Sequence, residues 1–174
     1  SSRIGARLEP FMVVDVQLYE GRNLDTVSQV EQLANYGAVI VDDYARYTAA
    51  SAVVEAAERL TREDSSSKHY LLVLGALRAL SAKEQASDQI LDSYLLRALA
   101  ISGWIANLTS CQGCGSDQTV LFSVHSGSVS CANCALPGSV RLGVEGIAHV
   151  GSLLAGDWQG VSQATSATRA TVSG

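Results

Sequence analysis

At 174 residues and a formal net charge of −5, the chain is long enough to bury a hydrophobic core and is acidic overall. Hydrophobic residues make up 47% of it and charged residues 17%, as in an ordinary globular protein. No apolar run reaches membrane-spanning length, and the acidic balance argues against a protein that binds nucleic acid over its whole surface.

Two segments near the start of the chain have the pattern of β-strands. Residues 12–19 alternate with a period of two, and residues 24–33 form a second run after the polar turn at 20–23. Two strands alone rarely fold in water. We therefore expect a hairpin that belongs to a larger sheet, with further strands in a segment before Ser1.

From residue 38 onward the periodicity is helical. Apolar side chains recur at three- and four-residue steps around 40–60, 67–80 and 90–101, and Gly103 is placed to end the third segment. A fourth helix is predicted over 144–154. The last residues, 163–174, are small and polar and show a helical spacing that only begins, so we expect this segment to be cut short. Three helices joined by short loops should pack as a bundle.

The four cysteines of the chain form two matched pairs. These are Cys111-Gln112-Gly113-Cys114 and Cys131-Ala132-Asn133-Cys134, with sixteen residues between them. Glycine and asparagine in and beside the pairs tolerate the tight backbone turn that brings two thiolates onto one metal. Two C-x2-C pairs at this spacing are a zinc signature, and the spacer reads as a strand at 119–124 followed by a turn at 125–128. The sequence predicts one structural zinc ion held by Cys111, Cys114, Cys131 and Cys134.

Four cysteines can also form disulfides, a redox-active pair or an iron–sulfur site. Two disulfides need an oxidising compartment, and the printed residues show no secretory segment. A redox-active C-x-x-C would be a single motif beside a βαβ pattern, whereas two pairs and no such pattern occur here. Iron–sulfur ligation also uses four thiolates and is compatible with the spacing. A set of four cysteine ligands leaves no open coordination position, which favours a structural role over metal catalysis.

Catalytic patterns are sparse. The three histidines, His69, His125 and His149, lie in no metalloprotease or serine-hydrolase motif, and no glycine-rich phosphate loop occurs. His125 lies between the cysteine pairs, either as a turn residue or as a hydrogen-bond partner near the metal. The neighbouring acids Asp42-Asp43 and the pair Asp88 and Asp92 fit charges at helix starts or on solvated faces. We expect no enzyme activity.

Basic residues are scattered, but three lie on the opening strands and their turn. On an oligonucleotide-binding (OB) barrel, Arg3, Arg7 and Arg22 would occupy groove or loop positions, where arginine contacts phosphate or stacks on bases. The same stretch carries five acids and is net acidic, so an ordinary solvated hairpin is the competing interpretation.

Several motifs in the same order resemble the RecO recombination mediators of bacteria, in particular their actinobacterial members. These motifs are residues 2–11, the turn at 21–25, Asp43-Tyr44-Ala45-Arg46-Tyr47, residues 92–97, the two cysteine pairs with their spacer, and Gly156-Asp157-Trp158. The resemblance covers the whole printed chain.

The resemblance implies an α+β fold. Part of an N-terminal OB-fold would occupy residues 1–37, and a helical domain would occupy 38–174 with a zinc finger inserted at 109–136. In the family, further barrel strands would precede Ser1 and a helix would follow Gly174.

The resemblance also implies a function. The protein would be a non-catalytic, cytoplasmic and nucleoid-associated mediator of DNA repair. It would bind single- and double-stranded DNA and anneal complementary strands. With RecR, it would help load RecA onto strands coated by single-stranded DNA-binding protein (SSB). The helical domain would dock the acidic, apolar tail of SSB, for which Arg46 and Arg97 are available charges.

Two other functions stay open beside the DNA mediator. A zinc-ribbon module that binds only protein would suit the net negative charge. The other is a redox switch, in which oxidation of the thiolates releases the metal. DNA binding should weaken steeply with added salt, whereas apolar docking should not.

Overall fold

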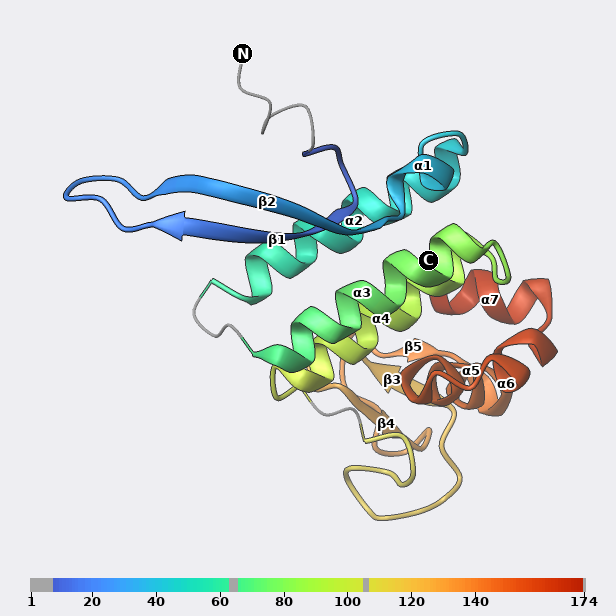
Figure 1. The fold of residues 1–174 in the computed structure, drawn as a ribbon. Coiled ribbons are helices and arrows are strands. Elements are labelled where there is room, and N and C mark those ends of the chain that lie inside the picture. The colour runs from blue at the N-terminus through green and yellow to red at the C-terminus, as the bar shows by residue number, and fades with distance from the viewer. Residues whose placement is uncertain (1–7, 63–65, 105–106, 174) are drawn as a thin grey trace.

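The structure, a computed structural model, describes residues 8–62, 66–104 and 107–173 (Figure 1). Its elements in chain order are β1 (Met12–Tyr19), β2 (Thr26–Asn35), α1 (Gly37–Ile40), α2 (Tyr44–Leu60), α3 (Ser67–Ala82), α4 (Ser87–Ile101), β3 (Leu121–Ser123), β4 (Ser128–Ser130), β5 (Val140–Arg141), α5 (Gly143–Ala155), α6 (Trp158–Gln163) and α7 (Ser166–Ser173). The predicted α+β class is confirmed.

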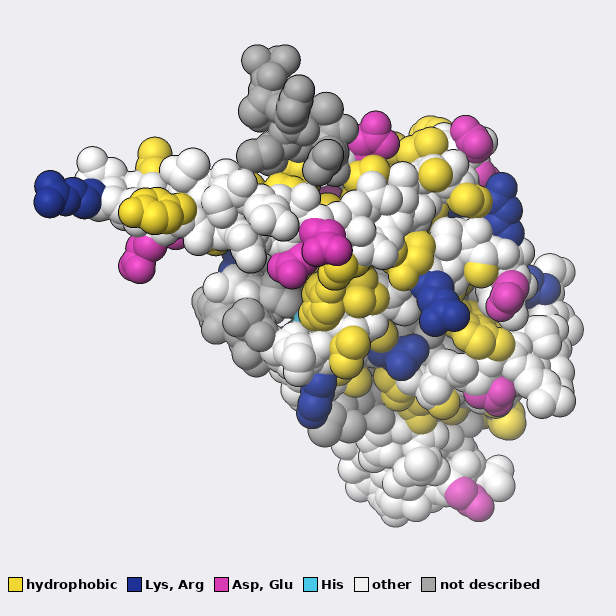
Figure 2. Space-filling view, viewed as in Figure 1, with side chains coloured by type: hydrophobic (Ala, Val, Ile, Leu, Met, Phe, Trp, Pro, Cys, Tyr) yellow, Lys and Arg dark blue, Asp and Glu magenta, His cyan; other side chains and the backbone are white. Residues whose placement is uncertain are grey.

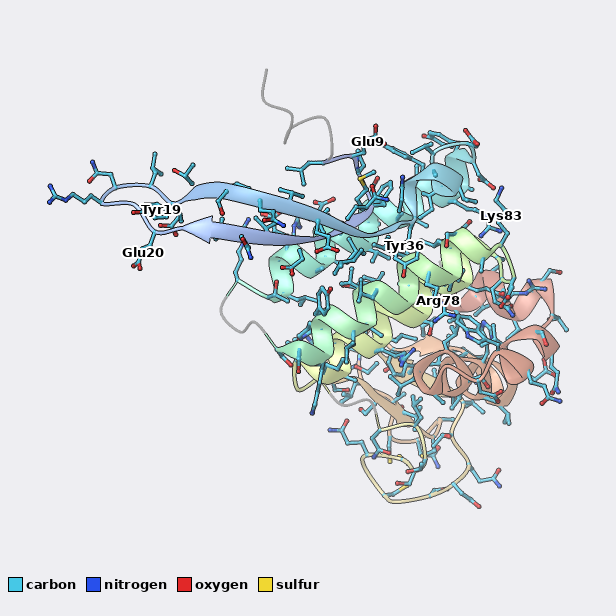
Figure 3. All side chains as sticks on the ribbon, viewed as in Figure 1. Glu9, Tyr19, Glu20, Tyr36, Arg78 and Lys83 are labelled. Carbon is cyan, nitrogen blue, oxygen red and sulfur yellow. The ribbon has the colours of Figure 1, made fainter. Side chains whose placement is uncertain are left out.

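Strands β1 and β2 form an antiparallel hairpin that reaches out from the helices (Figure 1). The pairing runs from Met12 opposite Asn35 to Tyr19 opposite Thr26, with two register shifts. Within the two strands only Val30 is buried. Among the described residues β1 and β2 pair only with each other and close no barrel. Figure 3 shows Tyr19 and Glu20 at the far end of the hairpin, away from the helices.

The base of the hairpin is fixed to α2. Phe11, in the left-handed backbone region at φ 63°, places its ring edge-on to Tyr47 of α2, with centroids 5.7 Å apart. The N–H of Tyr36 donates to the carbonyl oxygen of Phe11 at 3.3 Å and closes the base of the hairpin. The hairpin is therefore anchored at one end and exposed along most of its length.

Helices α2, α3 and α4 pack together around the main hydrophobic core. Its fully buried members include Ile40, Ala50, Val53, Leu80 and Ala98. The alanines let the helices approach closely, because the distance between two packed helices depends on the size of the side chains between them. The predicted bundle of three helices is confirmed.

The helix starts differ in detail from the sequence pattern. The run from residue 38 divides into α1 and α2, because Asp43 is the N-cap of α2 and accepts from the N–H of Arg46 at 3.2 Å. In α3, Ser66 is the N-cap, and its hydroxyl oxygen accepts from the N–H of Lys68 at 3.2 Å. Along the same helix Leu77 and Leu80 are buried, whereas Leu71 is 65% exposed.

A small three-stranded sheet in the order β4-β3-β5 follows the bundle, and α5 continues from it. The β3–β4 hairpin confirms the predicted strand and turn, while β5, a pair of residues, has no sequence signal of its own. Helix α5 confirms the predicted fourth helix and is tied to α4 by the buried Ser93 hydroxyl, which donates to the carbonyl oxygen of Leu153 at 2.7 Å.

The end of the chain folds back as α6 and α7. The Ser173 hydroxyl donates to Asp92 of α4 at 2.5 Å, and the Thr168 hydroxyl donates to Glu145 of α5 at 3.3 Å. No helix in the described part of the chain has the length and apolar character needed to cross a membrane.

Candidate metal centre and docking groove

The two cysteine pairs lie close together next to the β3–β4 hairpin. In the first pair, the N–H of Gly115 donates to the carbonyl oxygen of Cys111 at 2.8 Å, and Gly115 takes a φ of +73° that favours glycine. In the second, the N–H of Cys134 donates to the carbonyl oxygen of Cys131 at 3.2 Å. Both pairs therefore form the tight turns that their sequence predicts.

The sulfurs converge. All four Sγ atoms lie within 4.8 Å of one another, and those of Cys114 and Cys131 are 3.8 Å apart. Four sulfurs around a zinc ion with Zn–S bonds of about 2.3 Å would be about 3.8 Å apart. The separations thus fit a tetrahedral metal, and the donor set of four thiols suits a soft or borderline cation.

The two turns also fit against each other. A side chain at Gly113 would place its Cβ 2.9 Å from the Cβ of Cys134 and 3.0 Å from its Sγ. The N–H of Cys131 donates to the Sγ of Cys111 at 3.4 Å. Only glycine at 113 therefore lets the second turn close over the first, a constraint that a C-x2-C spacing does not reveal.

The protonation of the four thiols is uneven. Hydrogen bonds from the backbone of Cys131, and next of Cys114, lower the pKa of Cys111 to about 6. Hydrogen bonding with the other thiols, Cys131 first, raises the pKa of Cys134 to about 12. Repeated loss of protons within one cluster is unfavourable without a counter-charge, and a divalent cation supplies that charge. The chemistry of the cluster therefore fits a metal better than four free thiols.

A polar frame holds the first turn to the sheet. The N–H of Gln112 donates to the carbonyl oxygen of Val129 at 3.1 Å, and its side-chain oxygen accepts from the Ser128 hydroxyl. The hydroxyls of Ser126 and Ser128 are hydrogen-bonded at 2.7 Å. His125 is exposed in the turn and makes no hydrogen bond to the cysteines among the described residues. The serine-rich spacer, rather than its histidine, fixes the cluster.

The three arginines predicted to contact DNA are only partly described. Arg3 and Arg7 lie outside the described residues. Arg22 is exposed in the turn between β1 and β2, and Figure 2 shows dark-blue side-chain atoms at that tip. Its neighbours include the acids Glu20 and Asp25. The prediction that these three arginines contact DNA therefore stays a prediction.

Of the two charges expected to be available on the helical domain, Arg46 is used inside the fold. Its side chain is 12% exposed and pairs with Asp43 at 3.3 Å. Arg46 also donates to the carbonyl oxygens of Leu80 and Gln85, where α3 ends. The expectation that Arg46 is free for a partner is not supported by this geometry, because its two terminal nitrogens donate to backbone carbonyls and its Nε faces Asp43.

Arg97 instead borders a groove between α3 and α4. The groove has a volume of about 380 Å³. Its lining consists of Lys68, Leu71, Leu72, Gly75, Ala76, Ala79, Ile90, Ser93, Tyr94, Arg97 and Trp158. The lining contains two cations and no acid, and its other members are mostly apolar or small. We call this feature the α3–α4 groove.

Helix α3, one wall of the α3–α4 groove, is basic. Helix α3 contains no acidic residue, and Arg78 and Lys83 add positive charge along it (Figure 3). Figure 2 shows dark-blue side chains separated by yellow ones over α3 and α4. Sequence reasoning missed the groove because its shape depends on how α3 and α4 pack against each other and on Trp158, which is distant along the chain. The absence of acids from α3 was the available signal.

The sequence matches one family model and several known proteins. A family model described as "Recombination protein O C terminal" matches residues 41–173. The DNA repair protein RecO of a Nocardioides species is 44% identical over 170 residues, covering 94% of this chain and 70% of the relative. The protein of the same name from Thermobifida fusca is 41% identical over 176 residues, covering 99% and 72%.

A third relative, the DNA repair protein RecO of Streptomyces coelicolor, is 44% identical over 166 residues, covering 90% of this chain and 67% of the relative. All three organisms are actinobacteria, as the resemblance predicted. The family model covers well over half of the chain, and the relatives match nearly all of it. The chain therefore belongs to the RecO family of DNA repair proteins.

Proposed function

We propose that the chain belongs to a mediator of recombinational DNA repair that binds single- and double-stranded DNA and anneals complementary strands. With RecR, it would help load RecA onto strands coated by SSB. The observation that supports this proposal is the likeness to proteins named DNA repair protein RecO over nearly the whole chain. The proposed role needs no covalent chemistry and is carried out in the bacterial cytoplasm, at the nucleoid DNA.

The proposed division is an OB-fold part at residues 1–37 and a helical domain at 38–174, with the finger at 109–136. The change from strands to helices between Asn35 and Gly37 supports the boundary.

Annealing brings two negatively charged DNA strands together, so the phosphate charge must be neutralised. Contacts that depend on the identity of the bases would limit annealing to particular DNA sequences and are not needed. Arg3, Arg7 and Arg22 are the proposed contacts on the OB-fold part.

We propose that Cys111, Cys114, Cys131 and Cys134 bind one zinc ion with a structural role. The converging sulfurs and the closed set of four ligands support it. The stretch between the first and last cysteine contains no lysine or arginine. The finger is therefore proposed to hold the β3–β4 hairpin in place and not to contact phosphate.

For the α3–α4 groove we propose the acidic, apolar tail of SSB as the occupant. Charge complementarity supports this choice, because Lys68 and Arg97 border an apolar floor in a chain that is acidic overall. The small side chains of Gly75 and Ala79 leave room for a peptide backbone beside α3. An acidic residue would pair with the cations while an apolar one enters the groove.

The test of the proposed function is annealing of complementary oligonucleotides coated with SSB, at two salt concentrations. The printed chain, its Arg22→Glu variant and a full-length RecO relative would be compared, with Arg62→Glu in the printed chain as the control. Arg62 is exposed and pairs with Glu58 on α2. We expect annealing that weakens with salt and with the change at Arg22 but not with the change at Arg62. Absence of annealing by every protein would contradict the proposal.

A module that binds only protein is the second candidate. The absence of lysine and arginine from the finger and the apolar floor of the groove favour it. It predicts binding of the tail peptide together with no binding of DNA at any salt concentration.

A further inference from the structure

The four cysteines differ in how far solvent reaches them. Cys114 is exposed, Cys131 and Cys134 are half-buried, and Cys111 is 2% exposed. Cysteines that bind a metal are thiolates, and the thiolate is the form of the side chain that peroxides oxidise. Access therefore decides which ligand reacts first, and Cys114 is the most accessible of the four.

The partner within reach of Cys114 belongs to the other cysteine pair. The Sγ of Cys131 lies 3.8 Å from the Sγ of Cys114. Because a disulfide joins its sulfurs at about 2.05 Å, the two atoms need to approach each other by only about 1.8 Å. Oxidation of Cys114 would therefore place a reactive sulfur next to a second thiolate.

The other two sulfurs are engaged by the fold. The Sγ of Cys111 accepts from the N–H of Cys131 at 3.4 Å. A Cβ on Gly113 would lie 3.0 Å from the Sγ of Cys134, so the backbone of the first turn lies against that sulfur. Burial thus protects Cys111 and the first turn partly covers Cys134, while Cys114 stays open to solvent.

A bond between Cys114 and Cys131 would differ in its effect from a bond within either pair. The two residues are 17 positions apart, and the segment between them contains β3 and β4. Linking them keeps the two ends of the hairpin together without a metal. A bond within a C-x2-C pair would join near neighbours only and leave the two turns unconnected. The bond between the pairs is therefore the oxidised state that preserves the hairpin.

We propose that Cys114 and Cys131 are a peroxide-sensitive pair, whose disulfide removes two of the four metal ligands while it keeps the β3–β4 hairpin closed. This inference rests on the zinc ion proposed for the cluster. Exposed disulfides are reduced readily by thiols, so the change is reversible in a reducing compartment. The metal content of the finger would then follow the level of peroxide.

The oxidation takes place in two steps. The thiolate of Cys114 attacks one oxygen of hydrogen peroxide, the O–O bond breaks, and a sulfenic acid and a hydroxide ion result. The thiolate of Cys131 then attacks the oxidised sulfur, the S–S bond forms, and a second hydroxide ion leaves. Two protons from solvent convert both hydroxide ions to water. The two sulfurs thus supply the two electrons that reduce the peroxide.

The experiment treats the whole printed chain with hydrogen peroxide after its metal content has been counted by native mass spectrometry. Remaining thiols are blocked with iodoacetamide in denaturant, and thiols that reappear on reduction are labelled with N-ethylmaleimide. Trypsin cannot separate the pairs, because no lysine or arginine lies between Cys111 and Cys134, so chymotrypsin is used to cut after Phe122. Tandem mass spectrometry shows which cysteine carries which label and whether the two halves were joined.

We expect iodoacetamide on Cys111 and Cys134, N-ethylmaleimide on Cys114 and Cys131, and halves that stay joined until reduction. One metal ion per chain should be lost as the bond forms. The melting temperature should fall to a value between those of the metal-bound protein and the reduced protein stripped by a chelator. Dithiothreitol followed by zinc should restore it. Cys111→Ser and Cys114→Ser each remove one ligand, and only the first should still join the halves under peroxide.

Three results would overturn the inference while leaving the zinc proposal in place. They are halves that separate before reduction, metal loss without a disulfide, and a metal-bound chain whose four thiols all remain free under peroxide. A chain that carries no metal before peroxide is added would contradict the zinc proposal itself, and the switch with it. The metal count at the start therefore distinguishes the two failures.

Discussion

Arg46 of α2 donates from Nη1 to the carbonyl oxygen of Leu80 in the last turns of α3, at 2.9 Å. Its second terminal nitrogen donates to the carbonyl oxygen of Gln85 at 3.3 Å, and its Nε faces Asp43 at 3.3 Å. A positive charge at a helix C-terminus is favourable, because the last carbonyl groups there are unpaired. One side chain thus joins the start of α2 to the end of α3 and the loop beyond it.

We expect Arg46→Ala to lower the free energy of unfolding by about 2 kcal/mol, because hydrogen bonds from a charged group to buried acceptors are lost. Urea denaturation measures the change. Arg59→Ala is the control, since its pair with Glu55 is exposed on both sides and should contribute at most about 0.5 kcal/mol. Equal losses in the two variants would contradict the role assigned to Arg46.

The zinc proposal predicts that metal content and stability fall together. Cys111→Ser should lose the metal and lower the free energy of unfolding by roughly 4 kcal/mol or more, since metal loss is among the largest single effects. Mass spectrometry under native conditions and thermal melting give the two readings. Ala132→Ser changes a residue between two ligands without removing either and should keep both properties. Loss of DNA binding by Cys111→Ser at an unshifted melting temperature would contradict a structural role.

Glycine at 113 should be required for the metal centre. Gly113→Ala places a Cβ 2.9 Å from the Cβ of Cys134, so the second turn must move, and we expect a cost of about 1–3 kcal/mol with weaker metal retention. Gly75→Ala is the contrasting variant, because a Cβ there meets nothing within 4 Å in the middle of α3. It should stabilise the chain by about 0.5–1 kcal/mol. Titration with a chelator and urea denaturation distinguish the two effects.

His149 should make stability depend on pH. Burial, and next the charge of Arg169, lower the pKa of His149, while Asp92 opposes them. The unfolded chain therefore takes up a proton on His149 at about pH 6.5, before the folded chain does. Its contribution to stability is complete above that pH and is lost as the pH falls toward the lower folded pKa.

The His149 prediction is tested by the melting temperature as a function of pH. We expect His149→Gln to melt lower than the wild type near neutral pH and to lose less stability as the pH falls below about 6.5. His125→Gln is the control, because His125 is exposed in the finger turn. If His149→Gln keeps the full pH dependence of the wild type, another group is responsible.

The cysteine site was predictable from sequence because its ligands come from two short local motifs. A C-x2-C pair dictates its own turn, and the turn residues between the pairs dictate a hairpin that returns the second pair to the first. The closing contact of Gly113 with Cys134 was not predictable, since it depends on how the two turns meet in space. The helices were predictable for a similar reason, as their periodicity is a property of neighbouring residues.

The sequence by itself determined the α+β class, the bundle, the four cysteines and the resemblance to RecO, because each depends on local spacing or on motifs in order. Only the tertiary structure decided how the basic side chains are used. Arg46 and Arg97 look alike in the sequence, yet the first is committed to backbone carbonyls and the second borders the α3–α4 groove. The same holds for Ser93 and Tyr94, which are adjacent in the sequence. The Ser93 hydroxyl donates to Leu153, whereas the Tyr94 hydroxyl has no hydrogen-bond partner among the described residues. The physical reason is that a side chain's partners are set by packing between helices distant in sequence, which no local pattern encodes.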